Sequence, residues 1–574
     1  MNPSVSTSSP RTWLAVLALC LLLLLPNLTW WWFGHGVMLW VQALLLPTAL
    51  LAFLFALLGD VPWLACLLLL PFALLAPMET FYIAQYHHPT SAEIIATLVA
   101  TNPRETREYL GHALVPLTLC LAAGMSLALW AAWTCRKSRL RWRHDSRIWV
   151  LAIVILAPIA SFLVAFAGQP GSLPTRWFSG KALLLDLRSE IVSGYPFGIF
   201  PRFMQYHEEW DRMRANAATL EAFRFHARLT TPLHRRQIYV LVIGEASRRD
   251  HWQLFGYDRP DNPELTKTPN LVPIPDMLSA WPESITAIPM IVTRKPATAP
   301  WRQPWKEASI LRAMQEAGFD TWWISNQLAI GQFDSPVSMY AYEARHVVWL
   351  NHASWTAPGS YDEDLLQPLR DVLHGSGGDL FIVLHMMGSH ESYDYRYPPA
   401  FARFRPTVVG SGQVAERDAR ARNSYDNSIL YTDHVLAQII ATLRASGAVS
   451  ALWYESDHGE TLPTPTCAKE GHGLGTKPEY EIAALFWYSG AYATAFPQRV
   501  AAFKANADRR TMSADTFESL IDMASTDFPG HDESRSLFSP QWRYRPRIVD
   551  QNWSVDFDHA VFGKGCQVVL PPNG

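Results

Sequence analysis

The first third of the chain contains five long apolar stretches, and they restrict its possible folds more than any other feature. They lie near Trp13–Leu28, Val37–Leu58, Val61–Met78, Ala113–Thr134 and Ile148–Ala167. A helix needs about 20 apolar residues to cross a bilayer, and each stretch reaches or approaches that length. Residues 1–168 are therefore predicted to form a transmembrane domain of five helices.

The loop between the fourth and fifth stretches is strongly basic and predicts the orientation of the chain. Its sequence, CRKSRLRWRHDSR at 135–147, contains six Lys or Arg and one Asp. Short loops rich in Lys and Arg stay on the cytoplasmic side of a membrane. Counting spans from this loop puts the N-terminus inside. The same count puts the loop 79–112 and all residues from about 170 onward outside.

Residues 237–574 alternate short apolar runs with helical periods, which is typical of an α/β sandwich with a mostly parallel sheet. The predicted strands are Tyr239–Ile243, Thr321–Ile324, Leu380–Leu384, Ala451–Tyr454 and Ala483–Trp487. Residues 169–236 are mixed and rich in aromatic side chains, so we expect a bridging segment along the membrane surface. The net charge of -3 and the pI of about 6.7 give no reason to expect a nucleic-acid partner.

Polar side chains follow several of the predicted strands. Glu245 follows the first strand, Asp457 and His458 follow the fourth in ESDHGETL, and His390 follows the third in HMMGSH. His472 lies in the glycine-rich loop KEGHGLG. The carboxyl ends of parallel strands meet at one edge of a sheet, which is where ligands bind. Carboxylate oxygens together with imidazole nitrogen suit zinc, so we expect a zinc site at this edge.

A hydroxyl nucleophile is available in WPESITAIPMIVTR, residues 281–294, which offers Ser284 and Thr286. A hydroxyl bound to zinc loses its proton more easily and can attack phosphorus as an alkoxide. Ordinary helix capping by Ser or Thr explains the same residues equally well. Local sequence leaves both the role and the choice between the two hydroxyls open.

Cysteines are too few for a disulfide framework. Four of the six lie in or beside the apolar stretches, where packing explains them. Cys467 and Cys566 lie in the soluble part and can pair if that part is in an oxidising compartment. Sequence does not decide whether they do.

With these features in place, the chain resembles the bacterial phosphoethanolamine transferases of the alkaline phosphatase/sulfatase superfamily. VIGEASRRDHWQLFGYDR is similar to the family's first metal motif, and VLHMMGSHESYDYRYP to its phosphate-binding histidine stretch. SYDNSILYTDHVL resembles a helix of these enzymes, YESDHGETL the second metal motif, and GHG the histidine loop that follows. The resemblance implies an inner-membrane protein with five helices and a periplasmic α/β sandwich of the alkaline phosphatase/sulfatase type over residues 237–574.

The resemblance also implies roles for single residues. Glu245, Asp457 and His458 match zinc ligands, and the nucleophile is the fourth ligand. Counting back five residues from the proline of that motif gives Ser284, whereas Thr286 has the residue type of the well-known lipid A members. One zinc ion is expected, and a second is compatible with turnover.

Substrate contacts follow from the same resemblance. His390 and His472 match the residues that hold the phosphate oxygens of the donor. In TLVATNPRETREYL, residues 97–110, Thr101 and Glu105 fall on the spacing of the segment that meets the lipid donor, while Thr97 stands where Asn is expected.

The implied reaction takes phosphoethanolamine from phosphatidylethanolamine to lipopolysaccharide, on lipid A or the core, through a covalent enzyme intermediate, with release of diacylglycerol. WWISNQ at 322–327 and the scarcity of cysteine resemble the branch that acts on the core rather than on lipid A. Two alternatives remain: a phosphoglycerol transferase that uses phosphatidylglycerol, and a membrane scaffold of the same fold without catalysis. A sulfatase is disfavoured, because SITAIP lacks the C/S-x-P-x-R pattern from which formylglycine is made.

Overall fold

The computed structural model describes residues 10–33, 37–86, 89–92, 94–95, 110, 113–168, 194–299, 305–329, 335–351, 360–408, 417–551 and 553–572. The chain forms two compact units, Met1–Glu208 and Glu209–Gly574. The boundary between them falls within helix α11 (Ile199–Leu220). The finer division at residues 168 and 236 expected from the sequence stays a prediction.

The first unit is helical, and its helices match the five apolar stretches. They are α1 (Pro10–Phe33), α2 (Val37–Trp40), the π-helix η1 (Val41–Leu45), α3 (Leu46–Leu57), α4 (Pro62–Leu68), α5 (Leu70–Tyr86), α8 (Leu114–Lys137) and α9 (Ser146–Gly168). Within the described residues, three helices are long and apolar enough to cross a membrane, namely Pro10–Phe33, Leu114–Lys137 and Ser146–Val164. The pair α4 and α5, bent by 46°, gives a fourth span if it is counted as one.

The second apolar stretch forms no single helix long enough to count as a further membrane span in the described residues. There α2, η1 and α3 follow one another, and the apolar helix Ala43–Leu57 is shorter than the other spans. A π-turn interrupts regular α-helix, and Pro47 cannot donate a helical hydrogen bond. A fifth span therefore stays a prediction.

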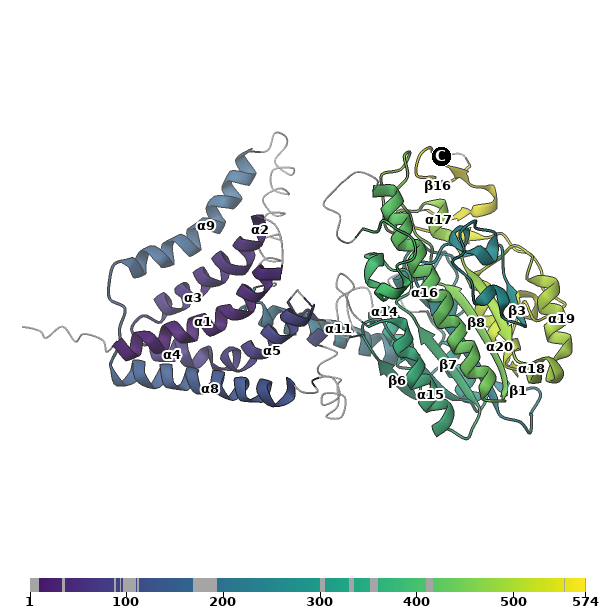
Figure 1. Cartoon of the computed structure of the whole chain (residues 1–574), viewed down its shortest axis with the longest axis horizontal. Coiled ribbons are helices and arrows are strands. Elements are labelled where there is room, and N and C mark those ends of the chain that lie inside the picture. The colour runs from purple at the N-terminus through teal and green to yellow at the C-terminus, as the bar shows by residue number, and fades with distance from the viewer. Residues whose placement is uncertain are drawn as a thin grey trace, which may run out of the picture. The chain divides into compact units, whose positions relative to one another are not determined.

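Small residues allow the helices of this unit to pack closely. Ala15 of α1, Ala73 and Ala76 of α5 and Ala128 of α8 are fully buried in one cluster with Leu19 and Leu23. A Cβ atom at Gly124 of α8 would collide with the Ala73 carbonyl of α5. In Figure 1 these helices lie side by side in purple and blue. Lipid does not drive helices together, so close contact between small residues supplies the attraction.

The second unit is built on a seven-stranded sheet with the strand order β3-β10-β8-β2-β7-β5-β6. The strands are β2 (Gln237–Gly244), β3 (Leu271–Pro273), β5 (Asp320–Ser325), β6 (His346–Trp349), β7 (Leu380–His385), β8 (Val449–Ser456) and β10 (Ala484–Tyr488). The sheet is mixed, because β8, β2, β7, β5 and β6 are parallel to one another while β10 pairs antiparallel with both β8 and β3. All five predicted strands are present, and the last of them, β10, is the one that runs against the parallel direction.

Both faces of this sheet are covered, as the unbroken apolar runs of its strands predict. Along β2, Tyr239, Leu241 and Ile243 belong to one buried cluster, and the residues between them belong to the other. The helices α15 (Leu366–Gly375) and α16 (Arg417–Ala445) cover one face, as Figure 1 shows. The other face is covered by α12 (Ser284–Val292), α13 (Ile310–Glu316) and α20 (Thr516–Met523).

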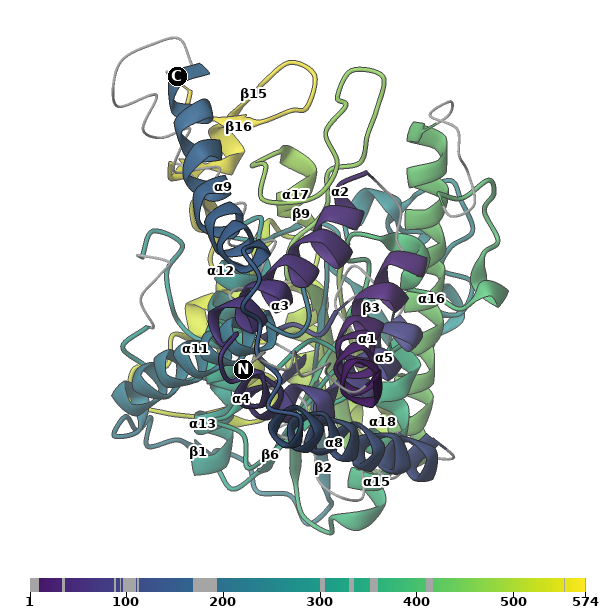
Figure 2. The ribbon, with the colours of Figure 1, turned by 90° about the vertical axis from the view of Figure 1, so that its left-hand side faces the viewer.

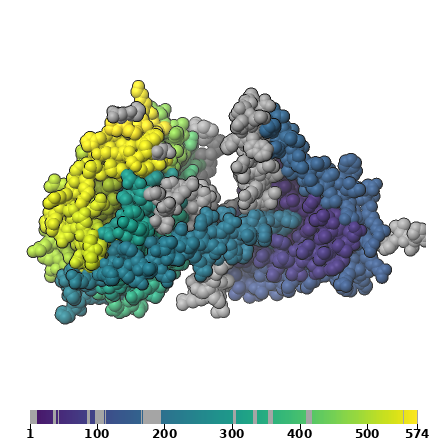
Figure 3. Space-filling view, turned by 180° about the vertical axis from the view of Figure 1, so that it is seen from behind, coloured from purple at the N-terminus to yellow at the C-terminus, as the bar shows by residue number. Residues whose placement is uncertain are grey.

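Shorter elements complete the unit. The helices are α14 (Ser335–Ala341), α17 (Lys477–Tyr480), α18 (Gly490–Ala495) and α19 (Pro497–Asn506). The strand pairings are β1 (Arg228–Leu229) with β12 (Thr526–Asp527), β4 (Met277–Leu278) with β9 (Glu481–Ile482) and β11 (Thr511–Met512), β13 (Ile548–Val549) with β14 (Val555–Asp556), and β15 (Val561–Phe562) with β16 (Val569–Leu570). The C-terminal residues, yellow in Figure 3, cover much of the rear face of this unit.

A disulfide joins Cys467 to Cys566, the pair that the sequence left undecided. It links the loop after β8 to the hairpin of β15 and β16, which lies next to α17 in Figures 1 and 2. Backbone hydrogen bonds tie the same segments together, from Val569 N–H to the Gly475 carbonyl and from Lys477 N–H to the Gln567 carbonyl. The C-terminal hairpin thus fixes both ends of the loop that contains His472.

Candidate active site and metal centre

Two neighbouring parallel strands bring the predicted ligands together. β2 and β8 are paired so that Gly244 lies opposite Ser456, and these two residues are the last of their strands. Glu245 and Asp457 therefore leave the sheet side by side, with the Asp457 N–H bonded to the Gly244 carbonyl at 3.1 Å. His458 follows directly. The strand-end position expected from the sequence is the one that the structure has.

Glu245, Asp457 and His458 form a compact set of possible metal-binding atoms. One atom of each lies within 4.8 Å of the others, and all three side chains are at most 1% exposed. His458 Nε2 is 3.2 Å from Glu245 Oε1 and 3.5 Å from Asp457 Oδ2. Together with Ser284, described below, these residues are called the donor cluster.

The hydrogen bonds around Asp457 and His458 leave atoms available to a metal ion. Asp457 Oδ1 accepts from the backbone N–H of Ala246 at 3.1 Å and of His458 at 2.7 Å. Within the described part of the chain, Asp457 Oδ2 is buried and has no hydrogen-bond partner. His458 Nδ1 donates to the Gly459 carbonyl at 2.7 Å, so Nε2 is the nitrogen that can bind a proton or a metal. Two carboxylates and an imidazole in this arrangement fit zinc.

The electrostatics of the donor cluster also favour a cation. Burial and the neighbouring Asp457 raise the pKa of Glu245 to about 7. Burial lowers the pKa of His458, but Asp457 and Glu245 outweigh it and the pKa rises well above its ordinary value. Both shifts mean that two carboxylates in a buried space require positive charge nearby, which a proton or a metal ion supplies.

Helix α12 distinguishes the two candidate hydroxyls. Ser284 is its first residue, and its Oγ lies 3.2 and 3.1 Å from Glu245 Oε1 and Oε2 and 3.2 Å from His458 Nε2. The Thr286 hydroxyl instead donates to the Glu283 carbonyl at 2.9 Å, and this side chain is 3% exposed. Ser284 therefore belongs to the donor cluster and Thr286 does not.

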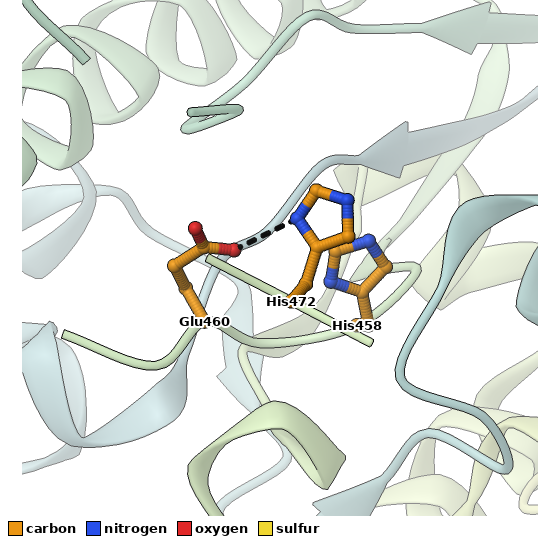
Figure 4. Close-up of side chains that lie close together, drawn as sticks. All are labelled: His458, Glu460 and His472. Atoms are coloured by element: carbon orange, nitrogen blue, oxygen red, sulfur yellow. Dashed lines mark hydrogen bonds and ion pairs between the residues drawn. The ribbon is translucent and has the colours of Figure 1, made fainter. Parts of the chain in front are cut away.

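The predicted phosphate-binding histidines lie beside the donor cluster. The rings of His390 and His472 are 5.5 Å apart, and the ring of His472 is 4.5 Å from that of His458. Glu460 Oε2 is 3.2 Å from His472 Nδ1, the contact dashed in Figure 4, and Tyr393 donates to Glu460 Oε1 at 2.9 Å. His390, His472 and Glu460 are called the histidine rim.

Glu460 has a role that sequence reasoning did not assign. Its position in ESDHGETL, next to the predicted zinc ligands, was the only feature that could have indicated a role. The neighbouring sequence does not show that Glu460 reaches His472, twelve residues away. With His458 and His472 it forms a second set of clustered possible metal ligands. The two sets share His458, and Figure 4 shows Glu460 directed toward His472.

Further residues fix the surroundings of the donor cluster and the histidine rim. Asp362 accepts from the N–H groups of Met387 and Gly388, both at 2.8 Å, and so fixes the loop before His390. Gln327 Nε2 is 3.4 Å from Glu245 Oε2. Arg248 bonds to Asp250 and, at 3.2 Å, to the Glu460 carbonyl. These contacts of Arg248 fix the turn after β2.

His385, the last residue of β7, is 4% exposed and makes structural contacts. It packs against Trp323 and Ser325, and burial lowers its pKa to about 4. Thr101 and Glu105, and Thr97 beside them, lie outside the described residues.

Comparison with known proteins defines the class to which this fold and site belong. The profile of the Sulfatase family matches residues 237–526, and the profile named Phosphoethanolamine transferase EptA/EptB matches residues 45–170. The chain belongs to the sulfatase family, in the phosphoethanolamine transferase branch of the alkaline phosphatase/sulfatase superfamily.

Individual relatives agree with this assignment. The chain is 26% identical over 506 residues to phosphoethanolamine transferase EptC of Escherichia coli strain K12, with 84% of each chain covered. It is 26% identical to phosphoethanolamine transferase CptA of Salmonella typhimurium, with 92% of this chain and 90% of that protein covered. The crystal structure of the C-terminal periplasmic domain of Escherichia coli EptC in complex with zinc is also similar, with a TM-score of 0.51 and 26% identity, covering 58% of this chain and 96% of that one.

Proposed function

We propose that the protein transfers phosphoethanolamine from phosphatidylethanolamine to a lipopolysaccharide-type acceptor, with zinc and through a covalent enzyme intermediate. The observation that carries this proposal is the position of the Ser284 hydroxyl, within 3.2 Å of both Glu245 oxygens and of His458 Nε2. The names of the relatives, EptC and CptA, support phosphoethanolamine as the transferred group.

Four residues would hold one zinc ion: Glu245, Asp457, His458 and Ser284. When bound, zinc lowers the pKa of a coordinated hydroxyl and offsets negative charge on phosphoryl oxygens. The zinc complex of the related Escherichia coli domain supports this choice of metal. Ser284 also begins α12, and the positive end of a helix dipole favours an anionic oxygen there.

In the first step, Ser284 Oγ attacks the phosphorus of phosphatidylethanolamine. The hydroxyl is already directed at the two oxygens of the Glu245 carboxylate, which can receive its proton. A bond forms between Oγ and phosphorus, the bond from phosphorus to the glycerol oxygen breaks, and diacylglycerol leaves with a proton. His390 and His472 hold the phosphoryl oxygens beside the nucleophile.

In the second step, an acceptor oxygen on a lipopolysaccharide hydroxyl or phosphate attacks the same phosphorus. The bond between Ser284 Oγ and phosphorus breaks, and the serine regains its proton. Glu245, Asp457 and His458 are buried, whereas His390 and His472 are partly exposed, so the acceptor approaches from the side of these two histidines. Splitting the transfer in two allows donor and acceptor to use one site in turn.

The cellular setting that fits these steps is the bacterial inner membrane with residues 237–574 in the periplasm. The apolar helices of the first unit and the basic loop 135–147 support this orientation. The Cys467–Cys566 disulfide supports it as well, since disulfides persist in oxidising compartments. Thr101 and Glu105 on the outer loop are proposed to contact the lipid donor.

A transfer assay with the purified full-length protein tests this proposal. Phosphatidylethanolamine labelled in the ethanolamine group and lipopolysaccharide are supplied in detergent, and labelled lipopolysaccharide and diacylglycerol are measured. We expect both products with zinc, and neither after chelation or with Ser284→Ala. Products from phosphatidylglycerol in place of phosphatidylethanolamine would favour the phosphoglycerol transferase. Full support of the cellular phenotype by an Asp457→Asn protein would favour a scaffold.

A further inference from the structure

The loop that carries His390 contains a carboxylate for which the proposed reaction has no use so far. Glu391 follows His390 directly and is partly exposed. Its backbone carbonyl accepts from Arg396 Nη2 at 2.9 Å and faces His390 Nδ1 at 3.5 Å. Within the described residues, its side-chain carboxylate makes no hydrogen bond and no ion pair. The backbone of Glu391 is therefore fixed while its charge is available.

The position of that carboxylate is defined by the glycine loop opposite. A Cβ atom placed on Gly471 would lie 3.9 Å from Glu391 Oε2, and, among the described residues other than 470–472, no other atom comes within 4 Å of that point. Gly471 has a φ of +105°, a conformation that glycine adopts easily and other residues rarely. The Glu391 carboxylate therefore lies where a side chain at position 471 would be in van der Waals contact with it, beside the residue that precedes His472.

The two neighbouring carboxylates are already engaged. Glu460 binds His472 and Tyr393, and Glu470 pairs with Arg417 at 2.9 Å. Burial, Glu460 and Glu470 raise the pKa of Glu391, against the opposing effect of His472 and Arg396. A cation placed beside Glu391 would relieve this crowding of negative charge.

We propose that Glu391 binds the ammonium group of the donor headgroup and so selects ethanolamine over glycerol. This inference rests on the proposed function, in which His390 and His472 hold the phosphoryl oxygens. Only two carbons separate the phosphate ester oxygen from the ammonium group, and Glu391 lies one residue from His390 and next to the residue before His472. A glycerol headgroup has no positive charge and gains nothing from this carboxylate.

The test compares two donors and two variants of the full-length, zinc-loaded protein. Diacylglycerol release is measured from phosphatidylethanolamine and from phosphatidylglycerol for the unaltered protein, Glu391→Gln and Glu470→Gln. A lost hydrogen bond between charged groups predicts a roughly ten-fold lower kcat/KM of Glu391→Gln with phosphatidylethanolamine, mainly through a higher KM. Release from phosphatidylglycerol should stay unchanged. Glu470→Gln, the same change at a carboxylate already paired with Arg417, should behave as the unaltered protein.

A binding measurement decides the inference without relying on turnover. Calorimetric titration of the Ser284→Ala protein with O-phosphoethanolamine and with glycerol 1-phosphate should show roughly ten-fold preference for the first ligand, from the same ion pair. Adding Glu391→Gln should abolish the preference. An unchanged preference, or an equal loss of both ligands, would overturn the inference. Absence of diacylglycerol release from either lipid by the unaltered protein would instead refute the proposed function, and the titration would still decide on Glu391.

Discussion

The donor cluster and the histidine rim lie side by side but are held in different ways. Glu245, Asp457 and His458 sit directly at strand ends and are at most 1% exposed. The side chain of His472 is 24% exposed. It comes from the loop between Cys467 and Lys477, which is attached to the C-terminal hairpin by the disulfide and by backbone hydrogen bonds. Buried groups on rigid strands suit chemistry that needs fixed geometry, whereas loops suit the recognition of substrates.

This difference has consequences for substitution. A change in the donor cluster leaves buried charge unpaired and removes the nucleophile or the metal, so its effects should be large. A change in the histidine rim alters groups that are neither the nucleophile nor proposed ligands of the zinc ion, so its effects should be moderate. The predictions below follow this order.

The largest expected effect is on the nucleophile. Ser284→Ala should lower transfer by about 10⁴-fold or more, as removal of a nucleophile does in other enzymes. Thr286→Val removes a hydroxyl that donates to the Glu283 carbonyl and lies outside the donor cluster, so it should keep activity within a few-fold of the unaltered protein. Steady-state release of diacylglycerol measures both. The reverse pattern would assign the reaction to Thr286.

The next effect concerns the metal. Asp457→Asn keeps the shape of the side chain but removes the charge of a carboxylate whose Oδ2 atom has no hydrogen-bond partner in the described part of the chain. Zinc affinity should fall by more than about 100-fold, since even residues that only support ligands contribute 10–100-fold. Competition with a fluorescent chelator measures the affinity. Asp394→Asn, a carboxylate outside the donor cluster, is the control, and equal zinc affinity in both variants would contradict the ligand assignment.

Within the histidine rim, Glu460→Gln should reduce transfer less. The amide keeps a contact with Tyr393 but loses the charge that pairs with His472. By analogy with residues that orient catalytic groups, we expect a reduction of roughly 10–100-fold. The affinity for zinc should change much less than in Asp457→Asn. A loss of zinc equal to that of Asp457→Asn would show that Glu460 belongs to the metal site instead.

The smallest effect on chemistry is expected from the disulfide. Cys467→Ser combined with Cys566→Ser frees the Cys467 end of the loop of His472 without touching the donor cluster. The free energy of unfolding should fall by about 2–4 kcal/mol. Thermal unfolding of the full-length protein under oxidising conditions checks this, and the activity at low temperature should stay within a few-fold. Complete loss of activity in a folded double variant would mean that the loop position depends on the disulfide.

Sequence alone predicted the parts of the site that depend on strand ends. Glu245, Asp457 and His458 follow apolar runs. To predict that they meet, only the rule that the carboxyl ends of parallel strands lie at one edge of the sheet was needed. To choose between Ser284 and Thr286, one must know which face of α12 points toward Glu245, and only the structure shows this. Residues two apart on a helix point about 200° away from each other, so only one of them can face Glu245.

Contacts between distant segments could not be predicted in this way. Glu460 reaches His472 across a glycine loop, and Cys467 meets Cys566 over a separation of 99 residues. The approach of the Glu391 carboxylate to Gly471 joins two loops that are about 80 residues apart in the sequence. In the first unit, composition predicted helices at every apolar stretch. It did not predict that the π-helix η1 interrupts the helix of the second stretch, because this depends on local backbone geometry.

The central claim is that Ser284 carries the phosphoethanolamine group during transfer, and peptide mass spectrometry tests it most directly. The full-length, zinc-loaded protein is incubated with phosphatidylethanolamine without acceptor, stopped with acid and digested with trypsin. The peptide from Thr268 to Arg294 contains both Ser284 and Thr286. We predict that it gains the mass of one phosphoethanolamine group, and that fragmentation locates this group on Ser284. An adduct on Thr286, or an unmodified peptide from protein that still releases diacylglycerol, would contradict the account.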